Sequence, residues 1–181
     1  MKRIIIATVL AVLGKLASAQ YQLASAQYQL VNDGSTVQFT IKNFGFNVTG
    51  TFTGLTGQVR FDARHPEDAS FDVGLNAASV NTDNTMRDDH LRKAAYFNTE
   101  KYPLIRLVSG KITGKNGGLL FTGKLTIKDH TKDLSFPFTW EAAGGGYRFK
   151  GVFTINRKDF DVGGTSTISD KLEVALDVNV K

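Results

Sequence analysis

Apolar and polar residues alternate along most of this chain, and this two-residue period is the feature that most constrains its fold. Clear examples run from Leu119 to Ile127, from Leu134 to Trp140 and from Leu172 to Val180. Successive side chains of a β-strand point to opposite faces, so each run predicts a strand with one apolar face. The same alternation occurs at residues 37–41, 55–61, 71–75 and 147–155.

Turn residues separate these runs, and strand length then favours a barrel. Turns are expected at Asn116-Gly117-Gly118, at 128–131 and at Gly144-Gly145-Gly146. The later runs span about ten residues, and a barrel of about eight such strands can just hold a small ligand. We find no domain linker. The pattern predicts an all-β fold: an antiparallel β-barrel of about eight strands.

Three glycines fall at positions that the alternation places on the inner face. Gly57, Gly123 and Gly151 remove bulk that a fully packed core would need. They either leave room for a ligand or mark bulges and bends in the strands. Both interpretations remain open from the sequence.

One segment, from Thr82 to Pro103, departs from the alternation. Its start is rich in Asn, Asp and Thr, and Thr85-Met86-Arg87-Asp88 fits a capping box. We therefore expect one short helical insert that begins near Thr85, with Leu91, Ala94 and Ala95 facing inward.

The same segment resembles the central signature of the YceI-like family. The matching residues are Arg87, Asp88, His90, Leu91, Tyr96, Phe97, Tyr102 and Pro103. Further matches are Gly45, Gly50 and Phe52, the run 123–127, and Phe153, Ile155, Arg157 and Phe160. The resemblance covers roughly Tyr28 to Val180. It implies a lipocalin-like barrel that holds an isoprenoid chain in an elongated apolar cavity.

Two positions depart from the family pattern. Asn43 stands where many members have a histidine before the Phe-Gly pair, and Asp129-His130 occupies a turn that often contains glycine. The first departure puts any polar contact near Asn43 in doubt, whereas the second affects only the turn.

The N-terminus has the layout of a secretory signal peptide. Lys2 and Arg3 precede an apolar run over 4–13, and Ala17-Ser18-Ala19 provides small residues for cleavage. We expect residues 1–19 to be removed, with an alternative cut after Ala26, which has the same context. Residues 20–181 would then be a YceI-like lipid-binding barrel domain, periplasmic or secreted. Since the apolar run is too short to span a bilayer and no cysteine can carry a lipid anchor, we expect a soluble mature protein without stable membrane insertion.

Removal of the leader leaves 19 basic and 17 acidic residues, a net charge of +2. Proteins that bind the phosphate backbone of nucleic acids usually present a cluster of basic residues on one face, so we expect no nucleic-acid partner. The absence of cysteine excludes disulfides and thiolate metal sites. Stability must then come from the apolar core.

Aromatic and aliphatic residues at the expected inward positions are candidates for the wall of a ligand cavity, because such walls contribute burial energy without directional partners. Periodicity alone favours a filled core, whereas the family resemblance favours the cavity. The candidate ligand-binding residues are Phe39, Ile41, Phe52, Phe61, Val73, Leu91, Phe97, Ile105, Phe121, Leu125, Phe136, Phe138, Phe149, Phe153 and Leu176.

Catalytic and metal-binding patterns are sparse. His65, His90 and His130 lack metal-ligand spacing, and no nucleophile elbow, phosphate loop or dinucleotide fingerprint occurs. We therefore expect no catalytic residue, metal or cofactor. His90 beside Asp88 and Asp89 could support acid/base chemistry, but a capped surface helix explains the same residues.

The cations of the helical segment could contact an anionic head group at a cavity mouth. The candidates are Arg87, His90 and Arg92, with Lys93 beside them. Pairing with the neighbouring aspartates is the alternative.

These observations predict an exported, non-enzymatic protein that binds and shields a long apolar lipid, an isoprenoid or isoprenoid-quinone precursor, for storage or transport. Two alternatives remain. One is a hydrolase or isomerase that uses His90 on a hydrophobic substrate. The other is a protein-binding β module with a filled core.

Overall fold

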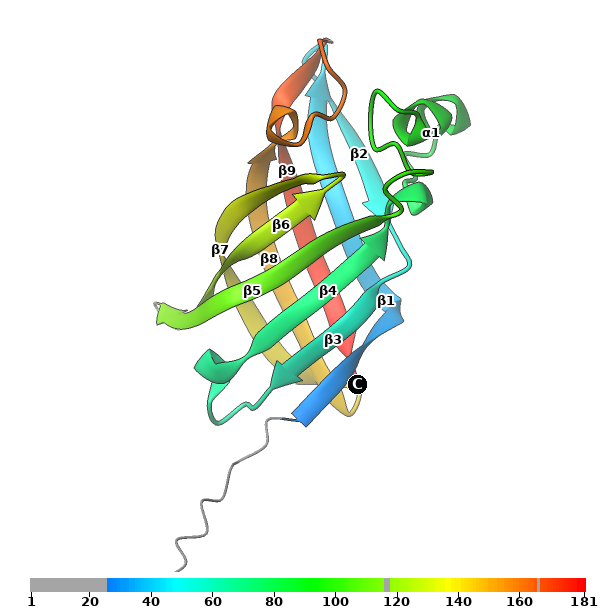
Figure 1. The fold of residues 1–181 in the computed structure, drawn as a ribbon. Helices are drawn as coiled ribbons and strands as arrows, with labels where there is room; N and C mark the ends of the chain where they lie inside the picture. Colours follow the sequence, from blue (N-terminus) through cyan, green and yellow to red (C-terminus); the bar gives the residue numbers. More distant parts are fainter. Residues whose placement is uncertain (1–25, 116–117, 166) are drawn as a thin grey trace, which may run out of the picture.

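The sheet closes on itself because the first strand pairs on both of its edges (Figure 1). The computed structural model describes residues 26–115, 118–165 and 167–181. The strands are β1 (Ala26–Asn43), β2 (Phe46–Phe52), β3 (Thr56–Phe61), β4 (Ser70–Asn76), β5 (Leu104–Lys115), β6 (Gly118–Ile127), β7 (His130–Ala143), β8 (Gly146–Asn156) and β9 (Ile168–Val180). Helix α1 (Thr85–Arg92) and the 3-10 turns η1 (Pro66–Asp68), η2 (Ala77–Ser79) and η3 (Arg157–Phe160) complete the fold.

The strands form a barrel of eight strand positions, because β2 and β3 follow one another along the same edge of β1 and together fill one position. Strand β1 pairs with β2 through its C-terminal half, as in Val37 with Phe52, and with β3 through its N-terminal end, as in Ala26 with Phe61. Its other edge pairs with β9. All pairings are antiparallel. The predicted antiparallel barrel of about eight strands with one short helix is confirmed.

The side chain of Asn32 joins two interruptions in neighbouring strands. Its Oδ1 accepts a hydrogen bond of 2.6 Å from the N–H of Leu55, and its Nδ2 donates one of 3.1 Å to the Leu55 carbonyl. Leu55 lies in the break between β2 and β3, and Asn32 lies in a bulge of β1 opposite β9. The amide thus gives both backbone groups of Leu55 a partner where the strand pairing is interrupted.

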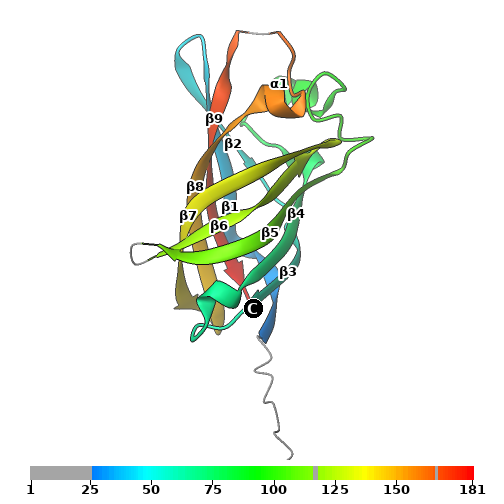
Figure 2. The same cartoon turned by 60° about the vertical axis from the view of Figure 1, so that its left-hand side comes forward.

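The alternation identified the inner face of most strands. In β6, the predicted face is buried at every second residue from Leu119 to Ile127. Phe136 and Phe138 of β7 and Phe149 and Phe153 of β8 are also buried. These strands wrap around the apolar core, and Figure 2 shows them from the side.

The sequence interpretation did not identify β2 and β5 as strands. In β5 the register shifts between Ser109 and Lys111. The shift moves the inward position from Ile105 and Leu107, which face a cavity, to buried Ile112. A bulge adds one residue and breaks the two-residue period, which hid this strand in the sequence.

The helix begins at Thr85 as predicted, but two details of the prediction are wrong. Its N-cap is Asn84, whose side chain accepts a hydrogen bond from the N–H of Arg87. Ala94 and Ala95 are exposed, because the helix ends at Arg92 and Lys93 has extended backbone. Leu91 is half-buried and packs against the core.

Two of the three glycines that the alternation placed on the inner face permit close backbone approach and leave no free space. A Cβ on Gly123 would lie 2.2 Å from the carbonyl oxygen of Val108. Gly57 is exposed and has a φ of +111°, and a Cβ there would lie 2.2 Å from the carbonyl oxygen of Asp72. At these two positions the glycine is therefore explained by the neighbouring backbone and not by space for a ligand.

The predicted leader and the cut after Ala19 lie outside the described residues. The alternative cut, after Ala26, falls at the first residue of β1. Among the described residues, no helix is long and apolar enough to cross a membrane.

Candidate ligand-binding site

A cavity of about 190 Å³ lies inside the barrel near the end that carries α1. Its wall combines residues of β1, β2, β4, β5, β6, β8 and β9 with the segment after α1 and the loop after η3. The predicted ligand-binding residues that line it are Phe39, Ile41, Phe52, Val73, Leu91, Phe97, Ile105, Leu125, Phe153 and Leu176. The remaining lining residues are also mostly aliphatic, so the wall is suited to hydrocarbon.

A second cavity of about 70 Å³ continues the first toward the other end of the barrel. Phe121, Phe136, Phe138 and Phe149 of the predicted set line it. The two cavities share the lining residues Leu30, Val73, Leu107, Leu176 and Val178. These five side chains therefore form a constriction between two apolar chambers, and the core is not filled throughout.

Aromatic packing closes the end opposite α1. The Phe61 ring lies 4.9 Å from that of Trp140, 4.7 Å from that of Tyr147 and 5.1 Å from that of Phe149, measured between centroids. Phe61 is fully buried and lines neither cavity. The structure thus places this candidate in the closed end, away from the cavity wall, because its edge-to-face contacts leave no space beside it.

Arg157 lines the larger cavity near the α1 end. It is one of the residues that match the family pattern, but it was not among the predicted ligand-binding residues. Only 3% of this residue is exposed. Its guanidinium donates to the carbonyl oxygens of Ser169 and Ile168 and to a carboxylate oxygen of Asp170, at 3.0, 3.2 and 3.1 Å. The alternation could have found it, because Arg157 continues the inward series of Phe153 and Ile155.

Two loops meet at this end of the cavity. The N–H of Gly163 donates a hydrogen bond of 2.7 Å to the carbonyl oxygen of Ala95. Tyr96 and Val162, the neighbours of these residues, both line the cavity. The contact joins the segment after α1 to the loop after η3, and these segments form the rim.

The predicted head-group residues lie elsewhere. Arg87 donates to the hydroxyl and the carbonyl oxygen of Thr82, both at 2.7 Å. Arg92 donates to the carbonyl oxygens of Ala78 and Val80, and His90 is exposed. None of the three lines either cavity. Both arginines instead hydrogen-bond α1 to the segment before it, residues 78–82.

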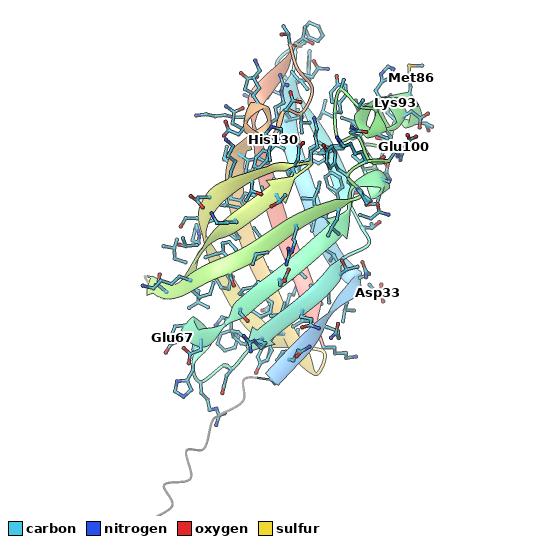
Figure 3. The ribbon with its side chains drawn as sticks, in the orientation of Figure 1. Asp33, Glu67, Met86, Lys93, Glu100 and His130 are labelled. Atoms are coloured by element: carbon cyan, nitrogen blue, oxygen red, sulfur yellow. The ribbon has the colours of Figure 1, made fainter. Side chains whose placement is uncertain are left out.

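The neighbourhood of His130 also has a structural explanation (Figure 3). The hydroxyl of Tyr102 donates a hydrogen bond of 2.8 Å to Asp129, which lowers the pKa of that carboxyl below its usual value. The Nδ1 of His130 lies 2.9 Å from the other oxygen of Asp129. These contacts tie the Tyr102-Pro103 pair to the β6–β7 turn. In the described part of the chain, no group of three or more His, Asp or Glu residues could hold a metal.

Comparison with known proteins matches the YceI-like domain to residues 28–180. A UPF0312 protein of Pseudomonas fluorescens is 37% identical over 137 residues, which cover 68% of this chain and 69% of the relative. A UPF0312 protein of Shewanella denitrificans is 31% identical over 154 residues, which cover 79% of this chain and 81% of the relative.

Solved structures share the fold. BcnA of Burkholderia cenocepacia superposes with a TM-score of 0.78 at 27% identity, covering 84% of this chain and 99% of that protein. A polyisoprenoid-binding domain of Saccharophagus degradans has a TM-score of 0.67 at 13% identity, with coverages of 87% and 98%. The second likeness concerns the fold alone.

Proposed function

Because the chain belongs to the YceI-like family, we propose that it is an exported protein that encloses a long apolar lipid of the isoprenoid type and does not transform it. The lipid would be a polyisoprenoid or an isoprenoid-quinone precursor, held for storage or transport. A long hydrocarbon tail is poorly accommodated by water, so its passage through an aqueous compartment requires an apolar enclosure.

The observation that carries the proposal is the pair of apolar chambers in series along the barrel. A branched hydrocarbon needs an extended wall without unpaired polar groups, because burying such groups without partners is costly. Most lining residues are apolar, and among the polar ones the buried Arg157 donates hydrogen bonds to protein oxygens. A domain of the same fold in Saccharophagus degradans is a polyisoprenoid-binding domain, so the fold is compatible with such a ligand.

The cavity volumes suggest how a long chain would be accommodated. An engineered cavity of about 150 Å³ with an apolar lining stays dry and binds benzene, so the larger chamber of about 190 Å³ suits a group of somewhat greater size. A chain of several isoprene units would extend into the second chamber. The constriction at Leu107 and Leu176 would have to open by rotation of side chains.

The direct experiment is native mass spectrometry of protein exported by its natural host. We expect a non-covalent apolar molecule that solvent extraction releases unchanged. Ligand-free native protein that also fails to take up added prenyl lipid would overturn the proposal. Turnover of the lipid by the wild type would favour an enzyme instead.

Two phenylalanine variants connect the ligand to the cavity. Phe153 lines the larger chamber, so Phe153→Ala should change ligand retention more than melting temperature. Phe61 lines neither chamber and is fully buried, so Phe61→Leu should lower the melting temperature and leave ligand retention unchanged. Equal effects of the two variants on ligand retention would contradict this assignment.

Export is tested separately by the intact mass of the mature protein. We expect residues 1–19 to be absent, with a minor species cut after Ala26. Retention of residues 1–13 in the exported product would contradict the export proposal and leave the lipid-binding proposal intact.

A further inference from the structure

Two phenylalanines at the tip of the β1–β2 hairpin are exposed to solvent. Phe44 is 74% exposed and Phe46 is 79% exposed, although the protein buries most of its other phenylalanines. The hairpin lies at the same end of the barrel as α1, beside the start of β9 (Figure 2). A single exposed apolar residue is common on protein surfaces, but here two aromatic rings occupy one protruding turn.

The backbone of this turn makes the choice of residue more unusual. Phe44 has a φ of +48° and Gly45 a φ of +84°. Two-residue hairpin turns with positive φ at both central positions favour Asn-Gly, because bulky residues are strained in this region. Phe44 therefore carries both a conformational penalty and an exposure penalty, which points to a role outside the folding of the barrel.

Phe46 lies on the same face of the hairpin as a residue of the cavity wall. It is paired with Asn43, and two residues further along the ladder Val48 is paired with Ile41, which lines the larger cavity. Cross-strand partners share a face, so Phe46, Val48 and Ile41 lie on the same face of the hairpin. On the neighbouring strand, pairing ends where Ile168 meets Asn43. The face that lines the cavity at Ile41 thus continues through Val48 to Phe46 at the exposed tip.

We propose that the tip of the β1–β2 hairpin inserts reversibly into the head-group region of a lipid bilayer, so that the cavity end of the barrel faces the membrane. This proposal rests on the proposed function, because a protein that carries a hydrocarbon ligand must collect it from a membrane or deliver it to one. Exposed aromatic rings partition into the membrane interface, where their apolar area leaves water.

Charge near the tip favours a membrane as the partner. Lys42, two residues before Phe44, is exposed and forms no ion pair with any described residue. A cation beside inserted aromatic rings is attracted to anionic lipids. Met86 of α1 is also 74% exposed at this end (Figure 3), but Asp83 and Asp89 flank it. The hairpin is therefore the part that inserts.

Vesicle flotation tests the proposal directly. The probes are phosphatidylcholine vesicles with and without phosphatidylglycerol, and the test variant is the double substitution Phe44→Asn with Phe46→Thr. Asn tolerates a positive φ and Thr suits a strand, so the variant should fold at least as stably as the wild type. We expect its vesicle binding to fall at least about tenfold, because burial of even one Phe side chain is worth about that factor.

The matched control is Val152→Thr, which changes an apolar side chain, 51% exposed, in the middle of β8. Its vesicle binding should remain within about twofold of the wild type, as expected for a surface change outside the contact. If the wild type binds neither kind of vesicle, or if the double variant binds as well as the wild type, the proposal is overturned.

Ligand uptake separates this proposal from the proposed function. A fluorescent prenyl probe delivered from ethanol should bind the double variant as it binds the wild type, whereas transfer from vesicles should be at least about tenfold slower. Failure of the wild type to bind the probe from ethanol would count against the lipid cavity alone. Loss of ethanol-delivered binding in the double variant would instead make the hairpin part of the ligand site and overturn the docking proposal.

Discussion

The Nη1 of Arg157 donates a hydrogen bond of 2.8 Å to the carbonyl oxygen of Val162, and both residues line the larger cavity. The same nitrogen donates to the carbonyl oxygen of Gly164 at 3.0 Å. One buried cation therefore holds the loop that connects η3 to β9. Since this loop forms part of the cavity rim, the shape of the rim depends on a residue that lies beneath it.

Replacement of Arg157 by Met should destabilise the protein strongly. Met keeps an apolar stem but removes every donor, so the carbonyl oxygens of Val162 and Gly164 lose this partner. We expect a loss of unfolding free energy on the order of 3 kcal/mol. The control Arg148→Met breaks a partly exposed pair with Asp177 and should cost less than about 1 kcal/mol. Urea denaturation measures both, and equal losses would contradict the role of Arg157.

A shorter side chain at the constriction should allow the barrel to retain longer ligands. Leu176 lines both cavities, so Leu176→Ala should join the two chambers. We expect a loss of about 2–4 kcal/mol in the ligand-free protein and tighter retention of longer prenyl chains relative to short ones. Native mass spectrometry with a series of chain lengths measures the change. An unaltered preference would show that the constriction does not limit the ligand.

Asp88 and His90 provide a contrast within α1. The buried carboxylate of Asp88 accepts hydrogen bonds from the N–H and the hydroxyl of Thr82, at 2.9 and 2.6 Å. Asp88→Ala leaves both donors unpaired and should cost about 1–3 kcal/mol. His90→Ala changes an exposed residue and should stay within about 0.5 kcal/mol, with ligand binding unchanged within a few-fold. If His90→Ala abolished turnover of a lipid in a folded protein, the enzyme alternative would be correct.

Asp177 should contribute to the loss of stability in acid. Its hydrogen bonds with Arg148 lower the pKa of the Asp177 carboxyl below the ordinary value of 3.8. A lowered pKa in the folded state means that this contribution is present above about pH 4 and disappears as the pH falls through the lowered pKa. Because the pair is partly exposed, the contribution should be less than about 1 kcal/mol.

The test is Asp177→Asn, compared with the wild type by urea unfolding at neutral and acid pH. The difference between the two proteins should be greatest near neutral pH and should vanish once Asp177 is protonated. In an Arg148→Met background, the same substitution should have little effect at any pH. A difference that grows as the pH falls would contradict the assignment.

Local patterns predicted the regular parts of the fold. Strands such as β6 and β9 were identified because their alternation is unbroken. Strand β5 was missed because the shift between Ser109 and Lys111 changes which residues face inward. The exposure of Ala94 and Ala95 was not foreseen, since the end of α1 depends on the backbone at Lys93. A helix period cannot show where the helix stops when no glycine or proline marks its end.

The sequence likewise predicted the candidate site only in part. The alternation predicted most of the residues that line the cavity, and the family resemblance implied the chemical class of the ligand. Phe61 could not be separated from Phe153 by sequence, because both occupy inward positions on strands. The two differ in which aromatic residues from other strands pack against them. Trp140 and Tyr147 pack around Phe61, whereas Phe153 faces the larger cavity.

By itself the amino-acid sequence determined the all-β class, the inner face of most strands and the position of the short helix. These depend on the pleat of a strand and on local capping, which act over a few residues. Only the tertiary structure decided where the barrel is hollow, that Arg157 holds the rim, and that Phe44 and Phe46 remain uncovered. Those properties depend on the register between strands far apart in the chain, and the register determines which side chains meet.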